Sequence, residues 1–126
     1  MSDKLDAEGL KVRKEVLGAD YVEASLAKAD DFMQTFQELT TNQCWGYCWT
    51  RPGLERRERS LLNLGMLAAM GKEAELKIHV RGAIANGLTA DEIKEVFVQV
   101  SVYAGVPAAF SAFRIAHETL KEMGEI

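Results

Sequence analysis

Apolar residues recur every three to four positions along most of the chain, which is the period of an amphipathic α-helix. Glycines separate the periodic segments at positions 18, 53, 71, 87 and 105, as expected for helix ends and turns. The pattern predicts helices at about 6–17, 21–28, 30–41 and 54–70, another between Gly71 and Gly87, one from Thr89, and a last one from near Pro107. We therefore expect an all-α, compact helical fold of about six to seven helices.

One segment fits two periods. Residues 96–103 carry valine at every second position, which is typical of a β-strand. A capping box from Thr89 to Glu92 and the length of the segment favour a helix instead. A helix places Val98 and Val102 on its outer side, where exposed valines indicate a subunit contact.

The middle of the chain is the most apolar part. From Leu61 the helix predicted at 54–70 is apolar nearly all round, interrupted by Asn63, so we expect it to be central and buried on most sides. The preceding segment, 42–53, is rich in aromatic residues and ends in a Pro-Gly turn signal. It is either the end of the third helix or a loop packed on it.

Composition narrows the class of protein. A chain of 126 residues, 48% hydrophobic and 27% charged, suits one globular domain spanning 1–126. A net charge of −4 and the absence of a Lys/Arg run argue against nucleic acid as a partner. The longest apolar run, 61–71, is too short to span a bilayer, and no secretory signal is visible. We expect no membrane partner, a cytoplasmic location and two free thiols.

The sharpest chemical candidates are Glu75 and His79. On a helical wheel they share one narrow stripe with Gly82 and Asn86. Apolar residues flank this stripe on both sides, and the charged Lys77 and Arg81 lie nearly opposite. Burying ionisable groups costs on the order of several kcal/mol unless they are paired or functional. We interpret this face as the floor of a site.

Three interpretations of the pair remain open. The carboxylate of Glu75 can orient the imidazole of His79, which then exchanges a proton near neutral pH. A purely structural Glu–His pair is as plausible. A zinc site needs a third ligand, for which His117, Cys44 and Cys48 are available. Because no second ligand pair has a matching spacing, we expect no metal.

A second group of candidates lies around the Pro-Gly turn. Arg51 and Arg57 offer bidentate donors for carboxylates, and Trp45 and Trp49 are close to them in sequence. The group suggests a pocket for a small anionic molecule, although a solvated helix end is the common alternative. Tyr103 ends a predicted helix and either lines the same pocket or belongs to the core.

Several motifs together resemble the carboxymuconolactone decarboxylase family. They are Trp45-Gly46, Trp49 to Leu54, Arg57-x-Arg59-Ser-Leu61, Glu75-Leu76-x-x-His79-x-Arg81, Asn86-Gly87 and Tyr103 to Ala108. Arg13, Val16 to Gly18 and Tyr21-Val22 also fit, so the resemblance covers almost the whole chain. It implies an alkylhydroperoxidase D-like helical fold, assembled as a homo-oligomer and usually a hexamer. It also implies decarboxylation of 4-carboxymuconolactone to 3-oxoadipate enol-lactone in the protocatechuate branch of aromatic catabolism.

The implied chemistry needs no cofactor. The electrons left by carbon dioxide flow through a double bond into the lactone carbonyl, so the protein must stabilise a dienolate and protonate carbon. We expect His79 to be the general acid or to polarise the lactone oxygen, with Glu75 setting its tautomer. Arg51 and Arg57 would bind the carboxylates of the substrate. The predicted walls of the site are Trp45, Trp49 and Tyr103.

Two other functions are weighed against this one. The wider superfamily includes peroxidases with Cys-x-x-Cys followed by His, which suggests thiol-disulfide or peroxidase work by Cys48 and His79. However, Cys44 and Cys48 are separated by three residues, so that motif is absent and a small apolar role in an aromatic cluster is favoured. The remaining alternative is a binding protein that keeps the scaffold and binds the lactone without turnover.

Overall fold

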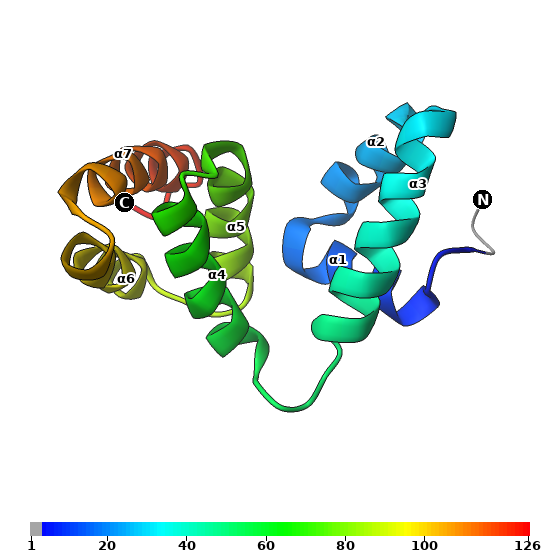
Figure 1. The fold of residues 1–126 in the computed structure, drawn as a ribbon, viewed down its shortest axis with the longest axis horizontal. Helices are drawn as coiled ribbons and strands as arrows, with labels where there is room; N and C mark the ends of the chain where they lie inside the picture. Colours follow the sequence, from blue (N-terminus) through cyan, green and yellow to red (C-terminus); the bar gives the residue numbers. More distant parts are fainter. Residues whose placement is uncertain (1–3) are drawn as a thin grey trace. The chain divides into compact units, whose positions relative to one another are not determined.

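The computed structural model describes residues 4–126, which form two compact units that meet in sequence at Glu55–Arg56. The first unit contains α1 (Ala7–Leu17), α2 (Ala19–Lys28), α3 (Asp31–Leu39) and a π-helix, η2 (Thr40–Cys48). The second contains α4 (Arg56–Met70), α5 (Glu73–Ala85), α6 (Ala90–Tyr103) and α7 (Val106–Glu122) (Figure 1). Residues 4–126 include no strand, so the predicted all-α class is confirmed. The single domain stays a prediction. No described helix is both long and apolar enough to cross a membrane.

Local side-chain caps explain why the helices begin where they do. The carboxylate of Asp6 accepts a hydrogen bond from the backbone nitrogen of Gly9 at 2.7 Å, and Asp30 does the same for Met33 at 2.9 Å. Before α6, Thr89 and Glu92 form the predicted capping box. These caps satisfy backbone donors that no helical carbonyl reaches, so the starts of the helices could be predicted closely.

The segment with two periods is helical. Residues 96–103 belong to α6, so the strand alternative is wrong. Ile93, Phe97 and Val100 are buried along one face of α6. Val98 and Val102 lie on the outer side, 46% and 73% exposed, as the helical interpretation requires. The subunit contact inferred from them stays a prediction.

The aromatic segment after α3 continues the helix, but with a wider turn. The backbone nitrogen of Trp49 donates to the carbonyl of Cys44 at 3.0 Å, a bond that spans five residues. Helix α1 approaches η2 very closely, because a Cβ at Gly9 would lie 2.5 Å from the carbonyl oxygen of Thr41. It would also lie 2.7 Å from the backbone nitrogen of Gly46, so only glycine fits at position 9 without a backbone shift. Sequence periodicity does not reveal this contact between two backbones.

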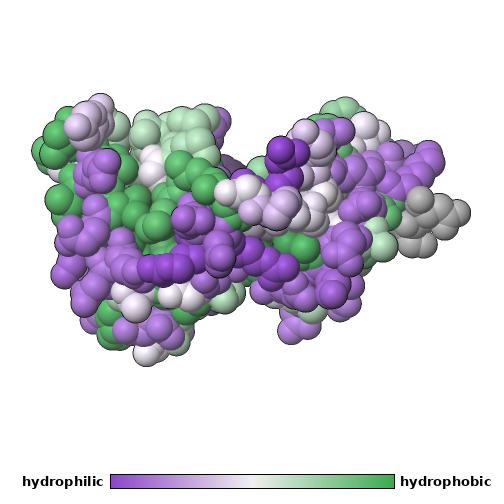
Figure 2. Space-filling model, turned by 90° about the horizontal axis from the view of Figure 1, so that it is seen from below, coloured by the Kyte–Doolittle hydropathy of each residue, from purple (hydrophilic) through white to green (hydrophobic). Residues whose placement is uncertain are grey.

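The second unit is a bundle of four helices around one apolar core (Figure 1). Leu64 from α4, Val80 from α5 and Phe97 from α6 are fully buried in that core. One prediction about α4 is wrong, because the helix is not buried on most sides. Its outer face leaves three large apolar side chains 52%, 51% and 64% exposed, namely Leu62, Met66 and Met70. Figure 2 shows hydrophobic side chains at the surface of this unit, interrupted by polar ones.

Candidate functional site

The imidazole of His79 lies on the face of α5 that packs against α4. Leu76 and Val80 on the same face are 2% and 0% exposed, so His79 emerges from the edge of the apolar core. The Nδ1 atom of His79 lies 3.2 Å from the side-chain nitrogen of Asn63 on α4. On the far face, Lys77 and Arg81 pair with Glu122 of α7, with Arg81 at 3.0 Å. Lys77 and Arg81 therefore lie away from the His79 face, as the helical wheel predicted, and the interpretation of that face as the floor of a site stays a prediction.

Two polar pairs cross the contact between α4 and α5. The first joins Asn63 and His79, and in the second the side-chain nitrogen of Asn86 donates to the hydroxyl of buried Ser60 at 2.8 Å. Asn86 is on the predicted stripe, whereas its partner Ser60 and the contact of Asn63 with His79 were not predicted. The signal for Asn63 was present, since it is the polar residue that interrupts the apolar run of α4.

The two members of the predicted Glu–His pair differ in their surroundings. His79 is partly buried, whereas Glu75 is exposed, so the expectation that both would be buried is wrong for Glu75. Burial lowers the pKa of His79, and the negative charge of Glu75 acts in the opposite direction and raises it. A histidine with a lowered pKa is neutral at pH 7. Its uncharged imidazole can donate one hydrogen bond and accept another.

This lowered pKa gives a pH-dependent contribution to stability. The unfolded chain binds the proton near the ordinary histidine pKa of about 6.5, whereas the folded chain resists it until a lower pH. Folding stability should therefore fall as the pH is lowered through about 6.5 and stop falling below the folded pKa. We expect denaturant unfolding of the wild type to show this loss, and His79→Gln to lack it. Identical pH dependence in the two proteins would contradict a lowered pKa.

Arg57, predicted to bind a substrate carboxylate, already has a carboxylate partner. Both terminal nitrogens of its guanidinium bind Glu92 in a bidentate ion pair, with Nη1 at 3.1 Å from Oε1. Nη1 also lies 3.3 Å from the carbonyl oxygen of Gly87. Arg57 thus links the start of α4 to the start of α6. Binding of a substrate by Arg57 stays a prediction, and it requires rearrangement of this pair.

Two variants separate these roles of Arg57. We expect Arg57→Ala and Glu92→Gln each to lower the free energy of unfolding by about 0.5–1 kcal/mol, because the pair is partly exposed. Glutamine at position 92 keeps the capping box, so this variant removes only the ion pair. If Arg57 also binds substrate, Arg57→Ala alone should raise KM. Equal KM values for Arg57→Ala and Glu92→Gln would indicate that Arg57 has only a structural role.

The predicted aromatic walls divide between a core and a surface. Trp45 and Trp49 are 3% and 6% exposed and stack with ring centroids 4.9 Å apart, together with Val12 and Val16 of α1. They form the core of the first unit. Tyr103, at the end of α6, is 85% exposed, so the alternative of a core tyrosine is wrong. That these three residues form walls of one site stays a prediction.

Arg51 follows η2 in the first unit. Its guanidinium lies over the ring of Tyr47, 5.0 Å from the ring centroid, and the tyrosine is 64% exposed. A cationic group at an exposed aromatic ring suits an anion arriving from solvent. The predicted contact between Arg51 and a substrate carboxylate stays a prediction.

The two cysteines are free thiols, as predicted. Burial, and to a smaller extent the neighbouring Cys48, raises the pKa of the Cys44 thiol to about 11. A thiol with such a pKa is protonated at neutral pH and is a poor nucleophile. The result favours the apolar packing role for Cys44. Within residues 4–126, no three His, Cys, Asp or Glu side chains are grouped to hold a metal ion.

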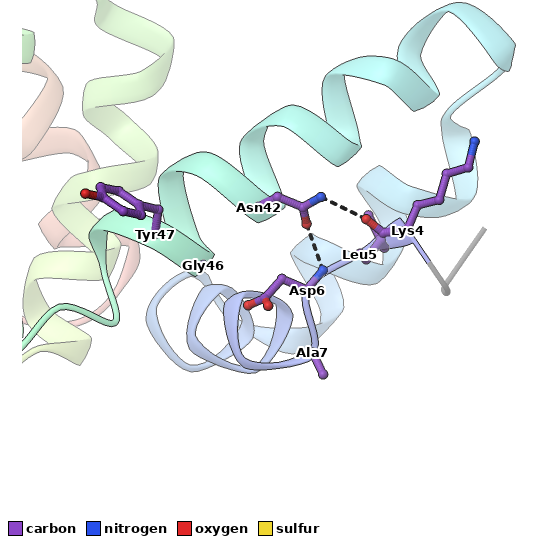
Figure 3. Close-up of a pocket in the computed structure, with 7 residues that line it drawn as sticks. All are labelled: Lys4, Leu5, Asp6, Ala7, Asn42, Gly46 and Tyr47. Carbon is purple, nitrogen blue, oxygen red and sulfur yellow. Dashed lines mark hydrogen bonds between the residues drawn. The ribbon is translucent and has the colours of Figure 1, made fainter.

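The first unit also has an open hollow of about 610 Å³ at the start of α1 (Figure 3). The side chain of Asn42 forms two hydrogen bonds with the backbone there. Its Oδ1 accepts from the backbone nitrogen of Asp6 at 2.7 Å, and its Nδ2 donates to the carbonyl of Lys4 at 2.8 Å. None of the residues predicted for the active site lines this hollow. These hydrogen bonds fasten the segment before α1 onto η2, and we assign them a structural role.

Comparisons with known proteins agree with the motifs. A model described as "Carboxymuconolactone decarboxylase family" matches residues 31–118. A 4-carboxymuconolactone decarboxylase of Acinetobacter baylyi is 45% identical over 117 residues, 93% of this chain and 87% of the relative. A nitrosuccinic acid decarboxylase of Metarhizium robertsii is 45% identical over 120 residues, 95% of this chain and 84% of the relative. An uncharacterized 15.0 kDa protein of Paracoccus denitrificans is 37% identical over 83 residues, 64% of this chain and 62% of the relative. The chain therefore belongs to the carboxymuconolactone decarboxylase family.

Proposed function

We propose that the chain is a carboxy-lyase that converts 4-carboxymuconolactone to 3-oxoadipate enol-lactone, in the catabolism of aromatic acids. The observation that carries the proposal is His79, partly buried at the edge of an apolar core with its Nδ1 atom 3.2 Å from Asn63 and with Glu75 one turn before it. The similarity to the decarboxylase of Acinetobacter baylyi, which spans 93% of this chain, supports the choice of substrate.

The neutral state of His79 favours one of the two roles expected for it. A neutral imidazole donates a hydrogen bond through its N–H and can polarise the lactone carbonyl into which the electrons flow. As negative charge develops on that oxygen, the pKa of the ring rises, because a nearby negative charge favours the imidazolium. Glu75 acts in the same direction. His79 therefore stabilises the dienolate first as a neutral hydrogen-bond donor. Its raised pKa then lets the ring take up a proton from solvent, and the imidazolium delivers that proton to carbon.

The second decarboxylase relative fits the same chemistry. In nitrosuccinic acid, the electrons left by carbon dioxide can pass into the nitro group, just as those of the lactone pass into its carbonyl. Both reactions place negative charge on an oxygen atom that a hydrogen-bond donor stabilises. Both substrates are also anionic, which suits Arg51 and Arg57 as the binding groups. Both substrates therefore share one requirement. When the carboxylate leaves as carbon dioxide, an adjacent electron-accepting group must take up the electrons left behind.

The finer features of the fold are part of the same proposal. We propose an alkylhydroperoxidase D-like arrangement and a homo-oligomer, with six subunits as the expected count. The exposed apolar faces of α4 and α6 support an oligomer, since large apolar patches on a soluble chain commonly mark contacts. The residues concerned are Leu62, Met66, Met70, Val98 and Val102.

A turnover assay tests the proposal directly. The purified chain is mixed with 4-carboxymuconolactone or, separately, with nitrosuccinic acid, and loss of substrate and release of carbon dioxide are followed. We expect conversion of the lactone at a substantially higher kcat/KM than that of the nitro acid. A higher kcat/KM for the nitro acid would show that the proposed substrate is wrong but that the chain is still a decarboxylase. Binding of both compounds without turnover would favour the non-catalytic alternative.

A cysteine double variant tests the thiol alternative in the same assay. Cys44→Ser/Cys48→Ser should retain wild-type decarboxylation, because no step of the proposed reaction uses a thiol. Reduction of a peroxide by the wild type that the double variant loses would instead support thiol-disulfide chemistry.

A further inference from the structure

A polar contact on α4 bears on how His79 works. Asn63 is partly buried in the otherwise apolar stretch of α4, and its amide nitrogen lies 3.2 Å from Nδ1 of His79. Fully buried Leu64 follows it directly in the core. A polar side chain in such surroundings is costly unless it is hydrogen-bonded, so the contact satisfies two groups together.

The contact has a chemical consequence because the two nitrogens of imidazole are not equivalent. An amide nitrogen carries only protons to donate, so Nδ1 of His79 must accept. In the neutral ring the single proton then resides on Nε2. The pKa of His79 is lowered by burial, so this neutral form is the one present at pH 7.

We propose that Asn63 is a positioning residue, which holds His79 in the tautomer with its proton on Nε2 by donating a hydrogen bond to Nδ1. The proposal rests on the proposed function, in which that Nε2–H is the group offered to the substrate oxygen. It adds Asn63 to the expectation that Glu75 sets the tautomer. The charge of Glu75 then tunes the pKa of the ring, while Asn63 fixes which nitrogen carries the proton and how the ring is turned.

The neighbouring Ser60–Asn86 pair provides a matched control. It crosses the same contact between α4 and α5, with a hydrogen bond of 2.8 Å, but it does not include His79. Removing either pair disturbs the packing of these two helices in a similar way. An effect seen for Asn63 but not for Ser60 therefore reports on the imidazole and not on the general integrity of the interface.

Nitrogen NMR of the imidazole rings decides the tautomer without any activity measurement. The chain has only two histidines, so a sample labelled with ¹⁵N-histidine gives two ring systems, which a His117→Gln variant assigns. In the wild type at neutral pH, Nδ1 of His79 should show the shift of an unprotonated nitrogen and Nε2 that of a protonated one. The opposite pattern in the wild type would overturn the proposal.

Variants then test the cause. In Asn63→Leu the donor is lost, so the two ring nitrogens should move toward an average of both tautomers. In Asn63→Asp a carboxylate faces Nδ1, so the proton should move to Nδ1. Ser60→Ala should keep the wild-type pattern. Unchanged spectra in both Asn63 variants would refute the role of Asn63, and the wild-type spectrum still decides the tautomer if a variant fails to fold.

Turnover connects the tautomer to the proposed function. We expect Asn63→Leu to lower kcat by roughly tenfold to a hundredfold, the range seen when a group that orients a functional histidine is lost, with little change in KM. Ser60→Ala should stay near the wild-type rate. A changed NMR pattern with unchanged kcat would confirm that Asn63 sets the tautomer and would show that the proposed function of His79 is wrong.

Discussion

His79→Ala should lower kcat/KM for 4-carboxymuconolactone by roughly a hundredfold or more, which is the scale expected when a proton-transfer or oxyanion-stabilising group is lost. In the proposed mechanism, the dienolate oxygen then loses its hydrogen-bond donor at the moment when negative charge reaches it. Because the ring is only partly buried, the variant should still fold. Turnover and thermal unfolding are measured on the same samples to establish this.

Two further histidine variants make that result specific. His117 is exposed on α7, so His117→Ala should keep the wild-type rate and control for loss of any imidazole. His79→Gln keeps a neutral N–H donor but cannot carry a proton near pH 7. Partial activity in His79→Gln would favour polarisation of the lactone oxygen, whereas activity as low as that of His79→Ala would favour proton transfer. A full rate in His79→Ala would remove His79 from the mechanism.

Phe97→Ala should be the most destabilising of the simple core substitutions, at about 3–5 kcal/mol. Phe97 is 0% exposed and meets Phe113 edge-on, with ring centroids 5.7 Å apart and planes at 72°. Truncation leaves a cavity between α6 and α7 that a packed helical core cannot fill by relaxation. Chemical denaturation measures the loss of stability. The measurement is repeated at two protein concentrations, because association between subunits, where it occurs, also changes the apparent stability.

Phe97→Leu is the matched control for this cavity. Leucine keeps most of the apolar volume, so we expect a loss of about 1.5 kcal/mol or less. The difference in the free energy of unfolding between Phe97→Ala and Phe97→Leu gives the cost of the larger cavity, apart from the loss of the aromatic ring. Similar small losses in both would show that the core of the second unit tolerates rearrangement around position 97.

The helices themselves could be predicted from local features. The capping box at Thr89 and Glu92 and the helical spacing of the apolar Ile93 and Phe97 involve residues only a turn or so apart. For α4 the same reasoning failed. Its residues are apolar nearly all round, but the outer face with Met66 stays exposed in this chain. Apolar residues show that burial of a helix face is favourable. Which other helix or subunit covers that face depends on tertiary or quaternary structure, which the local pattern does not contain.

The sequence predicted where the candidate site lies better than it predicted the surroundings of its side chains. The helical wheel placed His79 and Asn86 on one stripe, which the structure shows to face α4, and the motifs identified the family. It did not predict that Glu75 is exposed. Nor did it predict that Arg57 is already bound to Glu92, 35 residues away in the chain.

The sequence by itself determined the all-helical class, the positions of the caps, the polar face of α5 with Lys77 and Arg81, and the family. These depend on periodicity, capping and residue type, which act over a turn or two of helix. Tertiary structure alone decided that Asn63 contacts His79, that α1 reaches the backbone of η2 at Gly9, and that the Trp45–Trp49 stack is a core. Each of these features depends on packing between different helices, including that of α1 on the two tryptophans, and the register of this packing depends on how whole side chains fit together.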